Sequence, residues 1–186
     1  MPYPDLELVP PGVREAARRV RLACFDVDGV LTDGRVWMNP EGGELTKGFH
    51  VHDGLGFKML DGHGIAVAII STRQSGALSE RARELGVRHV YQGERDKLAR
   101  LDSVCESLGL VLDQVAYVGD DLPDLAPMSR VGLAIAVAHA PPWVLERAHH
   151  VTARAGGDGA AREVADLLLA AQDKAGVALA QALARS

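Results

Sequence analysis

The chain has 186 residues, 47% of them hydrophobic, and a formal net charge of −5. This length and composition fit one domain with a sizeable core. The acidic balance argues against nucleic acid or an anionic membrane as a partner, because either would require a basic face. No run approaches the roughly 20 apolar residues that span a bilayer, and the Pro-rich, acidic start is unlike a signal peptide. Cys24 and Cys105 fall within predicted elements, which favours buried free thiols and a cytoplasmic location.

Strands and helices alternate along most of the chain. After a short helix at 12–20 and an apolar strand at 21–25, strands at 35–38 and 44–51 flank the Asn-Pro-Glu-Gly-Gly turn of residues 39–43. This pattern predicts a projecting β-hairpin. The later strands are predicted at 65–70, 88–91, 115–118, 131–137 and 151–152, and the later helices at 54–62, 75–85, 94–108, 121–129, from 142, and over 159–184, where Gly176 is a weak point.

The alternation predicts an α/β fold, a Rossmann-like three-layer α/β/α arrangement with a mostly parallel central sheet. We expect an N-terminal extension with a short helix at 1–20, a main domain at 21–172 that includes the hairpin at about 35–51, and a helical tail at 173–186. In such a fold ligands bind at the carboxyl ends of the strands.

Two carboxylates follow the first strand directly. Alternation along the strand places Asp26 and Asp28 on the same side, and Gly29 permits a sharp turn after them. Like charges this close repel each other unless a cation or a proton lies between them. The alternative is an ordinary acidic turn at the end of a strand.

Polar groups also follow the other buried strands. Strand 65–70 leads to Ser71, Thr72 and Arg73, strand 115–118 leads to Asp120, Asp121 and Asp124, and Lys97 lies at the start of a later helix. Together the strand ends deliver acids, a hydroxyl and a lysine to one edge of the sheet, which is a stronger signal than any single motif.

This set suits the hydrolysis of a phosphate monoester. Mg²⁺ prefers oxygen ligands, for which Asp26, Asp28 and Asp120 are candidates, and it lets a carboxylate approach the phosphate anion. Our hypothesis is that Asp26 attacks phosphorus and that Asp28 protonates the leaving oxygen and then activates water. Lys97, Ser71 and the backbone N–H groups from Val27 to Gly29 would stabilise the transferring phosphoryl group.

The motifs resemble those of the haloacid dehalogenase superfamily of phosphotransferases. Over residues 20–172 the resemblance extends to the phosphatases of 3-deoxy-D-manno-octulosonate 8-phosphate, an eight-carbon keto-sugar acid phosphate of lipopolysaccharide biosynthesis. The segments that carry it are FDVDGVLTDG at 25–34, VHDGLG at 51–56, VYQG at 90–93, YVGDDL at 117–122 and AGGDGAAREV at 155–164. The final Gly-rich segment is the most family-specific of these.

The short gap from Asp28 to Ser71 resembles that of the capless class, in which the hairpin replaces a cap domain. The resemblance then implies a homotetramer whose hairpins form a central barrel and whose C-terminal tails cover neighbouring sites. By the same resemblance Gly156, Gly157 and Arg162 would lie near another subunit's substrate. The alternative for Gly156-Gly157 is the start of the last helix, with Asp158 as its N-cap.

The resemblance also implies substrate contacts at His52, Asp53 and Gly54, and the alternative for Asp53 is a turn residue that opens a helix at Gly54. Asp121 and Asp124 are candidates to orient the metal ligands or the lysine, and the alternative for Asp124 is an acid in the first turn of a helix. The family usually has Arg where this chain has His52 and Gly where it has Thr72, both near the substrate's carboxylate end. Arg73 remains available to bind a carboxylate in a bidentate manner, whereas His52 would bind it more weakly and in a pH-dependent way.

Three alternatives stay open. A related phosphatase of a nine-carbon keto-sugar acid phosphate shares the same motifs. A phospho-accepting receiver domain also uses Asp, Ser or Thr, and Lys around Mg²⁺, but it places the acceptor after a central strand. A catalytically silent structural subunit would not need every catalytic residue type that this chain carries.

Overall fold

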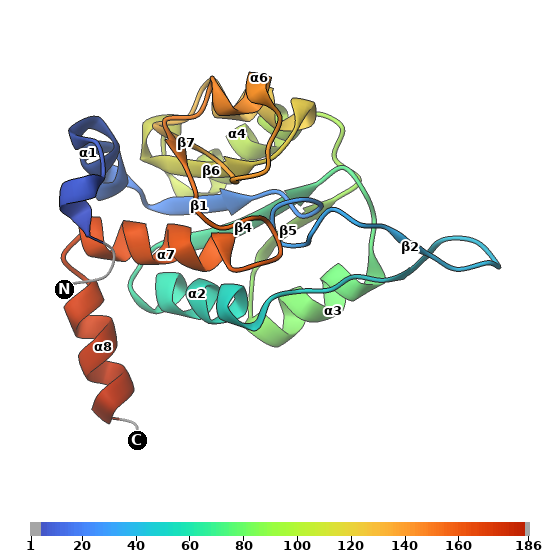
Figure 1. Ribbon diagram of the computed structural model, residues 1–186, viewed down its shortest axis with the longest axis horizontal. Coiled ribbons are helices and arrows are strands. Elements are labelled where there is room, and N and C mark those ends of the chain that lie inside the picture. The colour runs from blue at the N-terminus through green and yellow to red at the C-terminus, as the bar shows by residue number, and fades with distance from the viewer. Residues whose placement is uncertain (1–4, 185–186) are drawn as a thin grey trace.

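The computed structural model describes residues 5–184, so residues 1–4 and 185–186 of the expected extension and tail lie outside the described residues. A six-stranded sheet with the order β5-β4-β1-β6-β7-β8 forms the centre of the molecule (Figure 1). Its strands are β1 Leu22–Phe25, β4 Ala66–Ser71, β5 His89–Gln92, β6 Val115–Gly119, β7 Leu133–Ala136 and β8 His150–Val151. Each neighbouring pair in this sheet is parallel, which confirms the predicted fold class.

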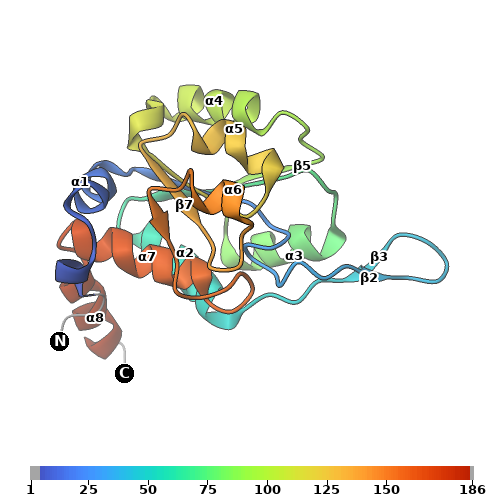
Figure 2. The same ribbon diagram turned by 45° about the horizontal axis from the view of Figure 1, so that its top comes forward.

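Helices cover both faces of the sheet (Figures 1 and 2). One layer contains α1 Pro11–Arg19, α2 Val51–Gly62, α3 Gly76–Leu85 and α7 Ala160–Ala171, and the other contains α4 Lys97–Leu108 and α5 Leu125–Met128. Helix α6 Pro142–Leu145 connects β7 to β8, and α8 Ala175–Ala184 follows α7. Single 3-10 turns lie at Leu6–Leu8, Leu112–Gln114 and Leu122–Asp124. Among residues 5–184, no helix combines the length and the apolar character that a bilayer crossing requires.

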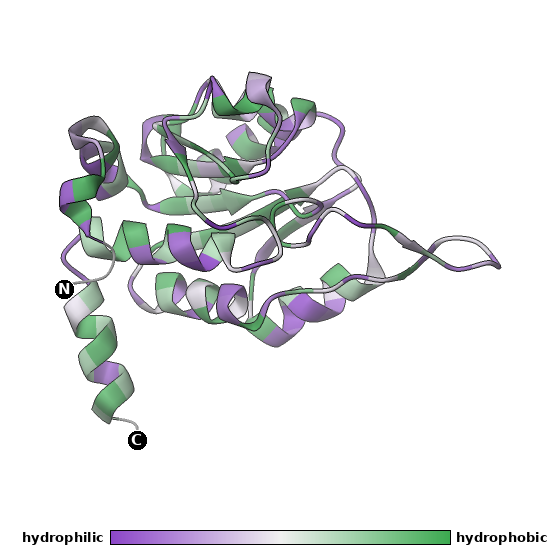
Figure 3. Cartoon of the chain, viewed as in Figure 1, coloured by the Kyte–Doolittle hydropathy of each residue, from purple (hydrophilic) through white to green (hydrophobic). Residues whose placement is uncertain are grey.

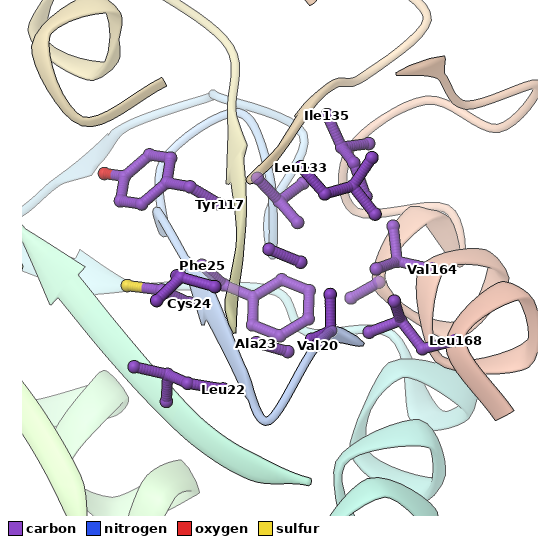
Figure 4. Close-up of a cluster of buried hydrophobic side chains, with 14 of the residues drawn as sticks. Val20, Leu22, Ala23, Cys24, Phe25, Tyr117, Leu133, Ile135, Val164 and Leu168 are labelled. Carbon is purple, nitrogen blue, oxygen red and sulfur yellow. The ribbon is translucent and has the colours of Figure 1, made fainter. Parts of the chain in front are cut away.

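The core is built around β1, all of whose side chains are buried. The ring of Phe25 lies 4.8 Å from that of Phe57, centroid to centroid, and Val164 and Leu168 of α7 point toward it (Figure 4). Cys24 belongs to the same core but points to the opposite side from the Phe25 ring (Figure 4), and its thiol, like that of Cys105, is free and buried. A central strand packed on both faces gives the residues after Phe25 a rigid support.

The expected hairpin projects from the body as β2 Trp37–Met38 paired with β3 Glu44–Thr46 (Figure 1). Both strands are shorter than predicted, and β3 ends before Lys47, whose side chain turns inward and is buried. The apolar side chains of the hairpin are exposed; they are Val36, Trp37, Met38 and Leu45.

The segment at 51–53 differs from the prediction. A strand was expected to end at Val51 and a helix to begin at Gly54, but β3 ends at Thr46 and α2 begins at Val51, so α2 includes His52 and Asp53. His50 caps this helix, since its Nδ1 accepts a hydrogen bond from the backbone N–H of His52 at 3.3 Å. Gly56 lets α2 pack close to Arg162 and Ala165 of α7, and such tertiary packing outweighs the low helix propensity of glycine.

The C-terminal helical stretch is divided where no break was predicted. Helix α7 ends at Ala171, Asp173 has a φ of 56°, and α8 then runs through Gly176, the expected weak point. Gln172 Nε2 donates to the carbonyl oxygens of Ala17 at 3.0 Å and Val20 at 2.8 Å, which fixes the end of α7. The N-cap of α7 is Gly159 and not Asp158. The helix predicted at 121–129 is likewise divided, into a 3-10 turn and α5.

Candidate active site

The strand order brings the polar strand ends together. Strand β1 lies between β4 and β6, with Phe25 level with Ile69 of β4 and Val118 of β6. Asp26, Ser71 and Asp120 therefore leave the sheet at one edge, as the sequence predicted. Lys97 reaches the same edge from the first turn of α4, where Asp96 is the N-cap.

Three carboxylates gather at this edge around one lysine. Asp26, Asp120 and Asp124 each offer an oxygen, and these oxygens lie within 4.8 Å of one another. Lys97 Nζ donates to Asp26 Oδ1 at 2.5 Å and to Asp124 Oδ1 at 2.7 Å. Although burial acts to lower it, the two carboxylates raise the pKa of Lys97, so the ammonium stays charged.

The acids carry more negative charge than Lys97 balances. Burial, followed by the charge of Asp124, raises the pKa of Asp26 to about 7. Burial, followed by the charge of Asp26, raises the pKa of Asp120 to about 8. A divalent cation with oxygen ligands would relieve both effects, so the chemistry of this cluster fits Mg²⁺.

Asp124 is already saturated with hydrogen bonds. Its Oδ1 accepts from Lys97 and from the Tyr117 hydroxyl, the latter at 2.8 Å. Its Oδ2 accepts from the backbone N–H groups of Asp120 at 3.0 Å and Asp121 at 3.4 Å. Asp124 thus fixes the loop that carries Asp120, and Asp26 and Asp120 are the carboxylates left for a metal. The side chain of Asp121 caps the 3-10 turn by accepting from the N–H of Leu122 at 2.7 Å.

The turn after Asp26 is shaped by Gly29, which has a φ of 92°. A Cβ at this position would lie 2.0 Å from Asp120 Oδ2, so only glycine lets the two loops meet. The Val27 side chain is buried, and the Gly29 N–H donates to Thr32 Oγ1 at 3.3 Å. The turn is therefore held by its own hydrogen bonds.

Asp28 is held apart from the three acids. Its Oδ1 forms an ion pair with Lys47 Nζ, and its Oδ2 lies 3.9 Å from Arg73 Nε. Ser71 is buried beside them, and its Oγ accepts from the backbone N–H of Arg73 at 3.2 Å. Thr72 is exposed at this edge. The predicted metal ligand Asp28 thus lies beside two cations, Lys47 and Arg73, and outside the group of the three acids.

Sequence reasoning missed Tyr117, Lys47 and Glu44. Tyr117 stands in an apolar strand, and nothing local indicates that its hydroxyl reaches Asp124. Glu44 and Lys47 are spaced i, i+3 at the base of the hairpin, and they form an ion pair at 3.0 Å. That spacing of opposite charges was the available signal, but it is also common on solvated surfaces.

Comparison with known proteins identifies the family. Residues 82–164 match the haloacid dehalogenase-like hydrolases. The 3-deoxy-D-manno-octulosonate 8-phosphate phosphatase KdsC of Yersinia pestis is 48% identical over 162 residues, which is 87% of this chain and 86% of the relative. The Escherichia coli K12 protein of the same name is 46% identical over 167 residues, 90% of this chain and 88% of its own length. The chain belongs to this phosphatase family.

A solved structure of the same family has the same fold. The Moraxella catarrhalis phosphatase, described in complex with a magnesium ion, a phosphate ion and a KDO molecule, superposes with a TM-score of 0.88 at 40% identity and covers 91% of this chain and 97% of its own. The predicted resemblance and the predicted enzyme class, a phosphoric monoester hydrolase, are confirmed. Membership in this phosphatase family argues against the receiver-domain and silent-subunit alternatives.

Within the phosphatase fold, the other predicted substrate-binding residues lie where α2 meets α7. Asp53 Oδ1 accepts from the backbone N–H of Arg162 at 2.8 Å, and Arg162 Nε donates to both carboxylate oxygens of Asp166, at 2.9 and 3.0 Å. Gly54 is buried against Arg81, whereas His52 is exposed. In this chain Arg162 is thus fixed by its own helix.

The Gly-rich segment of the phosphatase packs on the turn after Asp26. The N–H of Gly157 donates to the carbonyl oxygen of Val30 at 3.1 Å, and a Cβ at Gly156 would lie 1.7 Å from that of Gly29. Both glycines therefore support the active-site turn of their own chain. Their predicted proximity to another subunit's substrate stays a prediction.

Proposed function

We propose that this phosphatase hydrolyses 3-deoxy-D-manno-octulosonate 8-phosphate to the free sugar acid and phosphate, in lipopolysaccharide biosynthesis. The observation that carries the proposal is the cluster of Asp26, Asp120 and Lys97 at the edge of the sheet, with Asp28 beside it. The names of its relatives, which match most of the chain, support this substrate.

The placement of the acids supports the following mechanism. Asp26 and Asp120 would hold Mg²⁺, which when bound supplies positive charge to the phosphate oxygens. Asp26 attacks phosphorus in line, a bond forms between its carboxylate oxygen and phosphorus, and the bond from phosphorus to the sugar oxygen breaks. Asp28 gives its proton to that oxygen. It then takes a proton from the water that attacks the aspartyl-phosphate, which releases phosphate and restores Asp26.

Lys97 has two tasks in this scheme. Its ammonium holds the Asp26 carboxylate at 2.5 Å, and it places a positive charge beside the transferring phosphoryl oxygens. Ser71, buried at the end of β4, is the proposed hydrogen-bond donor to the same oxygens. These groups are fixed before the substrate arrives, so little reorganisation is needed during the reaction.

The test is phosphate release from the octulosonate phosphate with and without EDTA, in the wild type and in Asp26→Asn. We expect EDTA to stop turnover and added Mg²⁺ to restore it. The Asp26→Asn protein should keep its circular dichroism spectrum and lose turnover. Substantial activity in that variant would overturn the nucleophile, and strong activity on other phosphates alone would overturn the substrate.

A second candidate substrate is a nine-carbon keto-sugar acid phosphate. His52 and Thr72, which replace the usual Arg and Gly of the family, are the observation that favours testing it. Arg73, 43% of whose side chain is exposed at the site, can bind the carboxylate of either sugar acid. Values of kcat/KM for both compounds, measured side by side, decide between them.

We also propose a cytoplasmic homotetramer in which the tail of one subunit covers the site of another. The exposed apolar hairpin and the apolar, unburied α8 support this arrangement (Figure 3). The test mixes subunits with an Asp26→Asn substitution and subunits that lack residues 173–186. If the tail acts between subunits, the mixture should regain activity that both parents have lost. If it acts within one chain, mixing should restore nothing.

A further inference from the structure

Lys47, at the base of the hairpin, is a buried cation that the proposed mechanism does not use. Only 2% of its side chain is exposed. Its ammonium contacts Asp28 on one side and lies 3.0 Å from Glu44 Oε2 on the other. Burying a long charged side chain costs free energy, which the two carboxylates must offset. These contacts fix the orientation of the Lys47 ammonium, and through it they restrain the carboxylates of Asp28 and Glu44.

Glu44 anchors this lysine to the body of the molecule. Its side chain is 11% exposed, and its Oε1 accepts a hydrogen bond from the Ser75 hydroxyl at the start of α3. Although burial acts to raise it, hydrogen bonds from Ser75 and Lys47 lower the pKa of Glu44, which keeps it ionised beside the lysine. A continuous series of contacts thus connects Ser75 through Glu44 and Lys47 to Asp28.

The carboxylate at the end of these contacts is the proposed proton carrier. General acid catalysis requires its oxygen to lie within about 3 Å of the leaving oxygen, and small misplacements lower the rate steeply. Asp28 stands on a turn, and 21% of its side chain is exposed, so packing alone does not fix its orientation. Lys47 occupies Oδ1, so the proton that Asp28 gives to the leaving oxygen would be carried on Oδ2, on the side of Arg73.

We infer that Lys47 is a positioning residue that fixes Asp28 for proton transfer, so that the hairpin is part of the catalytic machinery. The inference rests on the proposed function. It differs from a structural role because it predicts which substrates suffer when Lys47 is lost. A sugar alkoxide is a poor leaving group that needs a proton, whereas p-nitrophenolate leaves without one.

The experiment measures kcat/KM, which reports the first phosphoryl transfer, for the octulosonate phosphate and for p-nitrophenyl phosphate. Lys47→Met should lose about 100-fold or more on the sugar phosphate, the usual size of a general acid's contribution, and less than about 5-fold on the aryl phosphate. Asp28→Asn should show the same selectivity. The double variant should be little worse than Asp28→Asn alone, because the residues act as a unit. Lys58→Met, a change at an exposed lysine of α2, is the matched control and should affect neither substrate.

Equal losses on both substrates would overturn the inference and assign Lys47 a structural role. If Lys47→Met does not fold, Glu44→Gln tests the same contacts with a smaller change, and it should lose about 10-fold on the sugar phosphate only. If Glu44→Gln loses as much activity on p-nitrophenyl phosphate as on the sugar phosphate, the inference is likewise overturned. A wild type that hydrolyses p-nitrophenyl phosphate but not the octulosonate phosphate would refute the proposed substrate instead. The comparison is then made with an alkyl phosphate that the wild type does hydrolyse.

Discussion

At the scale of single residues, the acids of the site divide into those that are satisfied and those that are not. Asp124 is buried, yet it accepts hydrogen bonds at both oxygens from Lys97, Tyr117 and two backbone N–H groups. Asp26 and Asp120 lack such a complement, and their pKa values rise to about 7 and about 8, mainly because of burial. A bound cation would therefore stabilise the charged forms of Asp26 and Asp120, whereas Asp124 already has its partners.

This division predicts the effect of Asp124→Asn. An amide of the same size would present N–H groups to Lys97 or to the backbone, so the loop that carries Asp120 would lose its support. We expect about 10- to 100-fold weaker Mg²⁺ activation, as for other residues that orient metal ligands. The measurement is the Mg²⁺ concentration that gives half-maximal turnover. Asp121→Asn is the control, because asparagine can still cap the 3-10 turn, and an equal effect there would contradict the assignment.

The raised pKa values predict a pH-dependent stability. Between the ordinary pKa of 3.8 and the folded value of about 8, folded Asp120 binds a proton that the unfolded chain has released. Its contribution to the free energy of unfolding of the metal-free protein is therefore lost as the pH rises through this range. The melting temperature in EDTA should fall more between pH 6 and pH 8 in the wild type than in Asp120→Asn. Mg²⁺ should stabilise the wild type more at pH 8 than at pH 6, and the same slope in both proteins would refute this origin.

At the scale of elements, helices and strands could be predicted from the sequence wherever the local residue pattern and the tertiary packing favour the same structure. The apolar runs of β1, β4 and β6 and the polar residues after them predict both the sheet and the edge where Asp26, Ser71 and Asp120 meet. The start of α2 at Val51 could not be predicted locally, because this helix is supported by the packing of Gly56 against α7. Lys47 shows the same limit, since its burial depends on Glu44 and Asp28, and Asp28 is distant in sequence.

The contact of the Gly-rich segment with the turn after Asp26 gives a prediction of its own. In Gly156→Ala the new Cβ would meet the carbonyl oxygen of Gly29 at 1.7 Å, so one backbone must move. We expect a loss of more than about 2 kcal/mol in the free energy of unfolding, measured by urea denaturation. Gly176→Ala, in the exposed first turn of α8 with open space around it, should change stability by less than about 1 kcal/mol. Equal effects would show that residue 156 is not tightly packed.

At the scale of the whole molecule, the hairpin and α8 both carry exposed apolar side chains. The hairpin exposes Trp37, Met38 and Leu45, and α8 has no buried residue among those described (Figures 1 and 3). Exposed apolar patches of this kind commonly mark interfaces between proteins. A capless active site is also open to water, so cover from a second subunit would serve catalysis.

The hairpin therefore predicts an assembly that one charge can disrupt. Trp37→Asp places a carboxylate in the proposed interface, and we expect light scattering to show monomers where the wild type forms tetramers. Trp143→Asp is the matched control, since Trp143 is also about half exposed but lies on α6, away from the hairpin. A wild-type monomer, or a Trp37→Asp tetramer, would remove the hairpin from the interface.

The chain turns at Asp173, so that α8 extends from the body with its apolar side chains exposed. This feature predicts that stability and activity depend on protein concentration. Val177 and Leu179 on that helix are 51% and 63% exposed in a single chain. If only another copy covers them, the folded state gains stability by mass action, and the melting temperature rises with the amount of protein present. Specific activity would then fall on dilution and recover on concentration. The specific activity measured for this enzyme would thus depend on protein concentration as well as on pH and Mg²⁺.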